Sequence, residues 1–373
     1  MLRVAIVGCG KIADSHAAQI GRITGSEIVG VCDREPLMAR QLAERFRIAR
    51  WTTDLGELLA TRPDVVHVTT PPASHFDIAR TCLGAGCHVY VEKPLAIDAN
   101  QTEALVALAM ENGRKLTVGH DDQFTHVARR MRALVQRGYL GGCPIHIESI
   151  YSYDLSEPGY ARALLADKAH WVRRLPGGLL QNIISHGIAR IAEHLTSDSP
   201  TVIAHGFVSA RLRGLGETEL VDEVRVVISE APGPTAYFTF SSQMRPSLHE
   251  LRLFGPRNGL ALDQDRETLI RLPGTRRKSY LEKFLPPLDL AWQELGNVVT
   301  NARTFLVRDF HMKSGMKYLM EAFYRSITHD TPLPIPYREI VLTARIMDAI
   351  FDQIRMRQPS EVTMTMRADT ERV

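Results

Sequence analysis

Short apolar runs alternate with longer amphipathic segments over the first 120 residues of the chain. The apolar runs are rich in β-branched residues with few polar interruptions, which is typical of parallel strands buried on both faces. We expect strands at residues 2–8, 27–33, 64–70, 88–93 and 115–120, and helices at 36–46, 75–86 and 100–113. Because helices separate the strands, this part is predicted to be a doubly wound α/β domain with right-handed crossovers.

The pattern changes after residue 122. The expected elements are an amphipathic helix at 124–141, strands at 144–154, 201–211, 222–230, 234–244 and 249–263, and helices at 288–309, 313–328 and 337–357. Strands without intervening helices favour an α+β domain with a largely antiparallel open sheet. Since 373 residues exceed the usual size of one hydrophobic core, we predict two domains, residues 1–122 and 123–373.

The composition argues against several classes of protein. With 45% hydrophobic and 23% charged residues, a net charge of +3 and scattered basic side chains, the chain indicates no nucleic-acid partner. The apolar runs are too short to span a membrane, and MLRVAIVGCG leads directly into a strand pattern, so we expect a cytoplasmic protein without membrane contact. The five cysteines have no metal-type spacing, so neither a disulfide framework nor a metal site is expected.

The first expected strand ends in a glycine-rich turn, GCGKIA at residues 8–13, which leads into a helix. Gly8 permits the tight turn, Gly10 lets a pyrophosphate approach the backbone, and the helix N-terminus faces the anion. The second strand ends in Asp33, at the spacing where an acid holds the ribose hydroxyls of NAD. The pattern predicts an NAD-binding Rossmann domain, while Arg34, which can accept the extra phosphate of NADP, leaves that cofactor open.

Two polar residues lie in an otherwise apolar segment, LPGGLLQNIISHG at residues 175–187. Asn182 and His186 are four positions apart, so a helix would place them on one face. A lone histidine on an apolar helix is more often a core residue than a catalytic one. The residues alone therefore leave both interpretations open.

Five motifs give the chain a resemblance to the Gfo/Idh/MocA family, named for glucose-fructose oxidoreductase, inositol dehydrogenase and a rhizopine-catabolism protein. They are GCGKIADSHA (8–17), TTPPASH (69–75), VEKPLA (91–96), GGLLQNIISHG (177–187) and LFGPRNGLALD (253–263). The resemblance runs over nearly the whole chain. It implies a Rossmann domain, an α+β domain whose open sheet often mediates oligomerisation, and a substrate cleft between them. A homodimer or homotetramer and a small polyhydroxylated substrate are therefore expected.

The resemblance also assigns roles on the cofactor side. Thr70, Pro71 and His75 match the loop that borders the cofactor, and the sequence EKP at 92–94 matches a family signature. The expected cofactor-binding residues are Gly8, Gly10, Lys11, Ile12, Asp33, Arg34, Thr70, Pro71, His75, Glu92 and Lys93.

Lys93 and His186 are the expected catalytic residues. Lys93 follows a strand at the mouth of the sheet, where open α/β folds bind ligands, and Pro94 restricts its backbone to an extended geometry. Partial burial beside a nicotinamide cation would lower the pKa of its amine. His186 matches the histidine of the central motif and can act as general base in oxidation, with Lys93 polarising the same oxygen.

The expected substrate-binding residues are Asn182, Asp122, Gln123, Tyr153 and Trp171. Asn182 stands where aspartate is commonest in the family, and an uncharged amide suits positioning a hydroxyl better than transferring a proton. Asp122 and Gln123 can hold sugar hydroxyls, but capping of the next helix is an equal alternative for the acid. For Tyr153 the alternative is packing, and for Trp171 it is a solvated basic loop.

These features together predict an NAD(P)-dependent oxidoreductase. It would transfer a hydride between nicotinamide and a secondary alcohol or ketone of a sugar, nucleotide sugar or cyclitol. One alternative is a redox-neutral enzyme that recycles a tightly bound NAD, and another is a ligand sensor without turnover. The retention of both Lys93 and His186 argues against the sensor.

Overall fold

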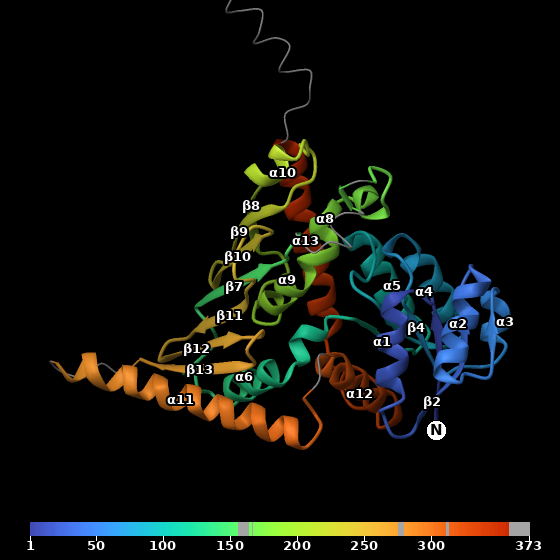
Figure 1. Ribbon diagram of the computed structural model, residues 1–373, viewed down its shortest axis with the longest axis horizontal. Helices are drawn as coiled ribbons and strands as arrows, with labels where there is room; N and C mark the ends of the chain where they lie inside the picture. Colours follow the sequence, from blue (N-terminus) through green and yellow to red (C-terminus); the bar gives the residue numbers. More distant parts are fainter. Residues whose placement is uncertain (156–163, 166, 275–279, 311–312, 358–373) are drawn as a thin grey trace, which may run out of the picture.

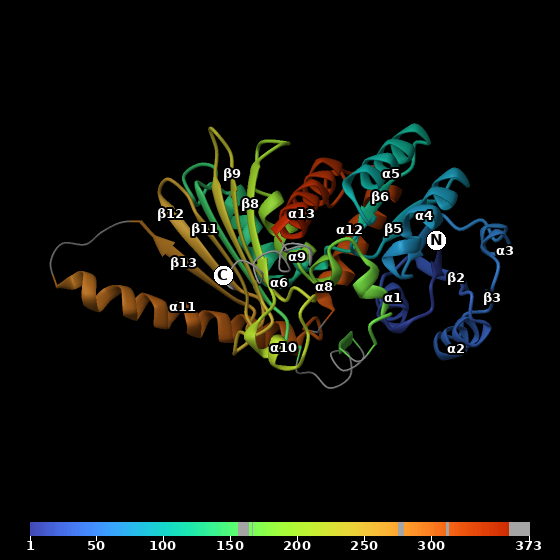
Figure 2. The same ribbon diagram turned by 90° about the horizontal axis from the view of Figure 1, so that it is seen from above.

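The computed structural model describes residues 1–155, 164–165, 167–274, 280–310 and 313–357. Two sheets dominate it, and the last two helices, α12 (Ser314–Thr328) and α13 (Tyr337–Arg357), run between them (Figure 1). The helices and strands of the first sheet lie together on one side of the molecule, and those of the second sheet lie on the other (Figure 2). No helix among the described residues is both long and apolar enough to cross a bilayer.

The first sheet has six strands in the order β3-β2-β1-β4-β5-β6, and every paired strand is parallel to its neighbour. Its strands are β1 (Leu2–Val7), β2 (Ser26–Cys32), β3 (Trp51–Thr52), β4 (Val65–Val68), β5 (His88–Val91) and β6 (Leu116–Val118). The helices around it are α1 (Lys11–Ile20), α2 (Pro36–Phe46), α3 (Leu55–Leu59), α4 (His75–Gly84) and α5 (Ala99–Glu111), with a 3-10 turn η1 (Pro72–Ser74). The predicted doubly wound α/β domain is confirmed.

The second sheet has seven strands in the order β13-β12-β11-β7-β10-β9-β8. They are β7 (His146–Ser152), β8 (Thr201–Phe207), β9 (Glu223–Ser229), β10 (Thr235–Ser241), β11 (His249–Phe254), β12 (Asn258–Asp263) and β13 (Thr268–Pro273). Only the central pair, β7 and β10, is parallel; the other pairs are antiparallel. This confirms the predicted largely antiparallel open sheet.

Short helices connect the sheets and the long C-terminal helices. They are the 3-10 turns η2 (Asp121–Phe124) and η3 (Trp171–Arg174), and the α-helices α6 (His126–Gln136), α8 (Gly178–Ile183), α9 (Ser185–Ala192) and α10 (Ala210–Gly214). Helix α11 (Leu281–Leu306) begins before the expected residue 288 because it continues through Pro286 and Pro287, which usually disfavour a helix interior. The apolar segment at 175–187 is helical from Gly178 onward and is interrupted at Ile184.

The C-terminal helices tie the two halves together. Apolar residues of α12 lie in the core of the first sheet: Met316, Leu319, Met320, Phe323 and Tyr324. Helix α13 packs against α5 on one side and against α9 and β8 on the other. The core around the first sheet therefore includes residues beyond the predicted boundary at 122.

Candidate active site

A cavity lies at the carboxyl ends of β1, β2 and β4 and brings together most of the residues predicted to bind the nucleotide. Its lining includes Gly8, Gly10, Asp33, Arg34, Thr70 and Pro71. In an open parallel sheet, this is the edge at which ligands bind. Lys11 and Ile12 start α1 beside it, with Lys11 exposed to solvent.

The two glycines of the turn differ in whether a side chain would fit at their position. Gly8 has a φ of +94°, and a Cβ there would lie 2.7 Å from the backbone nitrogen of Thr70, so a side chain is excluded. A Cβ on Gly10 would meet no atom within 4 Å. Because Gly10 borders the cavity at the N-terminus of α1, the open space beside it fits a pyrophosphate close to the backbone.

Asp33 is oriented by the backbone around it. Its Oδ2 accepts a hydrogen bond from the Cys9 amide at 2.6 Å, and its Oδ1 accepts one from the Glu35 amide at 2.9 Å. The carboxylate is therefore fixed to the glycine-rich turn at the edge of the cavity. Arg34 is exposed beside it.

His75 holds two loops together and does not line the cavity with its neighbours Thr70 and Pro71. It is fully buried, and its ring nitrogens lie 2.7 Å from the Thr70 carbonyl and 2.8 Å from the Pro94 carbonyl. His75 thus joins the cofactor loop to the turn that carries Lys93. Binding of the cofactor by His75 stays a prediction.

Lys93 connects the two halves of the site. Its Nζ donates a hydrogen bond of 2.6 Å to the backbone carbonyl of Asn182, four residues before His186. Burial lowers the pKa of the Lys93 amine below its usual value, although the negative charges of Glu92 and Asp121 oppose the shift. The lysine of the first sheet therefore reaches the helical segment that carries the candidate histidine.

Glu92 begins a buried polar chain behind Lys93. Its Oε1 lies 2.7 Å from Nε2 of His16, whose Nδ1 lies 2.8 Å from Nδ1 of His67; Nε2 of His67 lies 2.7 Å from the Tyr324 hydroxyl. Burial alone would raise the pKa of Glu92, but the hydrogen bond with His16 and nearby positive charge lower it to about 2. Glu92 thus supports the Lys93 turn from inside, and sequence reasoning missed the other three residues of this chain.

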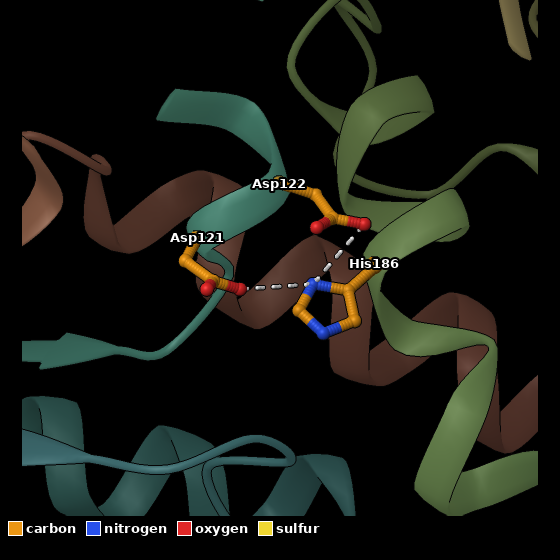
Figure 3. Close-up of side chains that lie close together, drawn as sticks. All are labelled: Asp121, Asp122 and His186. Carbon is orange, nitrogen blue, oxygen red and sulfur yellow. Dashed lines mark ion pairs between the residues drawn. The ribbon is translucent and has the colours of Figure 1, made fainter. Parts of the chain in front are cut away.

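Two aspartates face the ring of His186 (Figure 3). Nδ1 of His186 lies 3.8 Å from Oδ1 of Asp121 and 3.8 Å from Oδ2 of Asp122. The aspartates come from η2, directly after β6, while His186 lies in the first turn of α9. Burial lowers the pKa of His186 to about 4, although the negative charge of Asp122 opposes this shift.

Asp122 is held by three further side chains. Its Oδ1 accepts a hydrogen bond of 2.9 Å from Gln264, and its Oδ2 accepts one of 3.3 Å from the Tyr151 hydroxyl. The Arg190 guanidinium lies 3.7 Å from Oδ2. Burial raises the pKa of Asp122, but the charges of His186 and Arg190 outweigh it and hold the pKa below its usual range.

Comparison with known proteins relates the first part of the chain to an oxidoreductase family. A family model described as an oxidoreductase family with an NAD-binding Rossmann fold matches residues 2–120. D-Glucoside 3-dehydrogenase from Escherichia coli strain K12 is 37% identical over 142 residues, which are 38% of this chain and 40% of that relative. Myo-inositol dehydrogenase Hyg17 from Streptomyces leeuwenhoekii is 31% identical over 214 residues, which are 54% of this chain and 65% of that relative. The N-terminal region, residues 2–120, therefore matches the Gfo/Idh/MocA oxidoreductase family.

Solved structures extend the likeness in fold over the whole chain. The WlbA dehydrogenase from Bordetella pertussis, solved with NADH and UDP-GlcNAcA, has a TM-score of 0.76 at 17% identity, covering 95% of this chain and 96% of that one. The sequence matches are shorter, since the chain spans less than two thirds of the length of either curated relative. The likeness in fold therefore extends over both sheets, whereas the sequence matches cover only part of the chain.

The remaining predicted site residues fall into two groups. Asn182 meets Lys93 through its backbone carbonyl, and Asp122 faces His186. Gln123 is buried, and its amide donates to a carboxylate oxygen of Glu193 at 3.1 Å. Tyr153 and Trp171 both pack against the core of the second sheet. The structure thus brings only Asn182 and Asp122 to the site. Substrate contact by Gln123, Tyr153 and Trp171 stays a prediction.

The alternative role of Asp122 as a helix cap is wrong. Helix α6 is capped by Thr125, whose hydroxyl accepts from the Ala128 amide at 3.3 Å. Asp122 lies one turn earlier and directs its carboxylate toward His186 and Gln264. Its side chain is therefore available to the site.

Among the described residues, one group of side chains has metal-type spacing. Ligand atoms of Asp121, Asp122 and His186 lie within 4.8 Å of one another. However, the Arg190 guanidinium already lies 3.7 Å from Asp122, and a cation bound beside it would experience like-charge repulsion. We therefore interpret these side chains as an ionic and hydrogen-bonding group, and the expectation that the protein holds no metal stays a prediction.

Proposed function

We propose that this protein is an NAD(P)-dependent oxidoreductase acting on a secondary alcohol or ketone of a sugar, nucleotide sugar or cyclitol. The observation that carries the proposal is the contact between Lys93 Nζ and the Asn182 carbonyl. It places the lysine at the mouth of the nucleotide-binding sheet and beside the segment that carries His186. In this proposal Lys93 and His186 bind the same substrate oxygen, on the side of the sheet toward which the nicotinamide half of a dinucleotide would extend.

The side chains have complementary tasks in this proposal. The bound cofactor supplies or accepts the hydride. His186 is neutral at neutral pH because its pKa is lowered, so its ring can accept the proton of the substrate hydroxyl. The Lys93 amine donates a hydrogen bond to the same oxygen and stabilises negative charge that develops there. Asn182 positions the lysine through its carbonyl.

NAD is the preferred cofactor in this proposal. The Asp33 carboxylate is fixed by two backbone amides at the edge of the cavity, where it can accept hydrogen bonds from ribose hydroxyls. Its negative charge would repel the extra phosphate of NADP. Arg34 is exposed and free to turn toward that phosphate, so we expect weaker but measurable use of NADP.

The substrate class is supported by the curated relatives. One is named as a dehydrogenase of D-glucosides at carbon 3, and another as a myo-inositol dehydrogenase. Both names describe polyhydroxylated rings with secondary alcohols. The polar groups around His186 suit such a ring because each hydroxyl needs a hydrogen-bonding partner when it leaves water.

A substrate panel tests the proposal. Sugars, nucleotide sugars and inositols are incubated with the protein and NAD, and in parallel with NADP, while NADH or NADPH formation is followed by absorbance. Formation of NADH with at least one member is the expected result. Copurified NAD with substrate conversion but no net NADH would indicate a redox-neutral cycle. Ligand binding without any conversion would indicate a sensor and contradict the proposal.

A further inference from the structure

The acid that the family motif most often places at position 182 is missing from this chain, but carboxylates reach His186 from another element. Asn182 stands in the motif, and Asp121 and Asp122 approach the ring from η2 (Figure 3). We propose that Asp122, assisted by Asp121, is the positioning carboxylate of His186 in this protein. The proposal rests on the proposed function, because it assigns the partner of its proton-transfer group.

The geometry selects one nitrogen of the ring. Both carboxylates lie 3.8 Å from Nδ1 of His186, and Nε2 is on the opposite side of the ring (Figure 3). A neutral imidazole has one N–H donor and one acceptor nitrogen, and a carboxylate beside Nδ1 favours the tautomer with the proton there. The lone pair of Nε2 is then available to the substrate. At 3.8 Å the contact is longer than a hydrogen bond, as is common for catalytic groups before substrate binds.

Asp122 is the better anchored of the two aspartates. Tyr151 in β7 and Gln264, directly after β12, donate hydrogen bonds to its two oxygens. Arg190 supplies positive charge but no hydrogen bond, since its guanidinium nitrogens have no hydrogen-bond partner within the described structure. The carboxylate of Asp122 is therefore oriented by neutral donors and retains hydrogen-bonding capacity toward His186.

Asp121 differs from Asp122 in its electrostatic surroundings. Burial and the negative charge of Asp122 raise the pKa of Asp121 to about 7, although Lys313 and Lys93 oppose the shift. Two neighbouring acids whose pKa values are shifted in opposite directions commonly have different roles. Asp122 is the permanent negative charge beside the ring, and Asp121 adds a smaller contribution.

The proton transfer is balanced without moving a proton onto either aspartate. In the oxidation direction the substrate O–H bond breaks, its proton forms a bond to Nε2 of His186, and its electron pair forms the C=O bond as the hydride leaves for NAD. The resulting imidazolium is stabilised by the charge of Asp122, and its Nδ1–H points at that carboxylate. The electrostatic surroundings of the ring are completed by Lys93, Glu92, His120 and Arg190.

The first test uses the wild-type protein without substrate. Histidines are labelled with ¹⁵N, and the His186 signals are identified by their loss in His186→Gln. The expected result is the neutral tautomer with the proton on Nδ1. Observation of the proton on Nε2 would overturn the proposal. Because this readout needs no turnover, it is independent of whether the proposed function holds.

The second test compares matched Asp→Asn variants. Asp122→Asn is expected to lower kcat by about 10- to 100-fold with little change in NAD affinity, and to lower the pKa of His186 measured by NMR. Asp121→Asn should have a smaller effect in the same direction. Asp352→Asn, an exposed site that pairs with Arg355, is the control and should match the wild type.

Two outcomes of these variants would contradict the assignment. Wild-type kcat and an unchanged His186 titration in Asp122→Asn would overturn it while leaving the proposed function intact. Loss of activity on treatment with EDTA, restored by a divalent cation, would show that the carboxylates are metal ligands and would also overturn it. If Asp122→Asn does not fold, the wild-type tautomer still decides the question.

Discussion

At the scale of single residues, the charge of His186 depends on how deeply the fold buries it. Only 8% of the residue is exposed, and desolvation lowers the pKa of its ring to about 4. The imidazole is therefore neutral across the pH range in which an exposed histidine would change charge. This state suits a general base in alcohol oxidation.

The pH dependence of oxidation follows from this shift. A base acts in its unprotonated form, so kcat/KM should stay high from neutral pH down to about pH 5 and fall as His186 becomes protonated near its pKa of about 4. The measurement is kcat/KM for NAD reduction against pH, with circular dichroism as the control for acid unfolding. A fall centred at the ordinary histidine pKa would contradict the assigned environment.

Local motifs allowed some residues of the site to be predicted, but not others. Gly8 and Asp33 directly follow the ends of β1 and β2 and line the cavity, so their positions could be inferred from spacing. Lys93 could be placed in the same way at the end of β5. The approach of Asp121 to His186 depends on how η2 packs against α9, and no local pattern encodes that contact. The sequence did suggest Asp122 for the site, but as a binder of hydroxyls.

At the scale of secondary-structure elements, the polar chain from Glu92 to Tyr324 joins β5, α1, β4 and α12. All four ring nitrogens of His16 and His67 lie within hydrogen-bonding distance of another member of this polar series, and all of its residues are buried. A buried polar group that loses its partner costs more free energy than an exposed one. The buried side chains from Glu92 to Tyr324 should therefore stabilise the attachment of α12 to the first sheet.

Removal of one hydroxyl from this chain tests its contribution. Tyr324→Phe leaves Nε2 of His67 without its partner and should lower the free energy of unfolding by about 1–3 kcal/mol. Urea unfolding followed by circular dichroism measures the change. The control is Tyr318→Phe on the same helix, because that hydroxyl donates to Asp309 where water can replace it. Equal losses in both variants would argue against a special role for the buried chain.

The elements themselves were predicted unevenly. Buried β-branched strands and long amphipathic helices follow from periodicity, and both sheets were expected. Strand β13 (Thr268–Pro273) was not, because its short run offers little alternation to recognise. The break at Ile184 and the 3-10 turn at Asp121–Phe124 were also missed, since tertiary packing and not local propensity decides such short features.

At the scale of the whole molecule, α11 leaves an apolar surface uncovered. It packs against β13, but large apolar side chains on its outer faces are exposed, including Trp292 at 71% and Leu295 at 52%. Exposed apolar patches of this kind commonly mark protein interfaces. A second copy of the chain is the expected partner, in agreement with the predicted homodimer or homotetramer.

A charge placed on this surface should separate the subunits. Trp292→Glu combined with Leu295→Glu is expected to convert the oligomer to a monomer, because a buried carboxylate without a partner is costly. Light scattering after size-exclusion chromatography measures the mass. Leu37→Glu, at an apolar residue on α2 that is 64% exposed, is the control and should keep the oligomer. A monomeric wild type would contradict the prediction.

The most direct test of the proposed mechanism is turnover by Lys93→Met with the best substrate of the panel. Methionine is similar in length to lysine, but it has no amine and cannot donate a hydrogen bond to the substrate oxygen. We predict that kcat for NADH formation falls by about 100- to 10,000-fold while the dissociation constant for NAD stays within about threefold of the wild type. Retention of the wild-type kcat would contradict the central claim that Lys93 acts at the reacting oxygen.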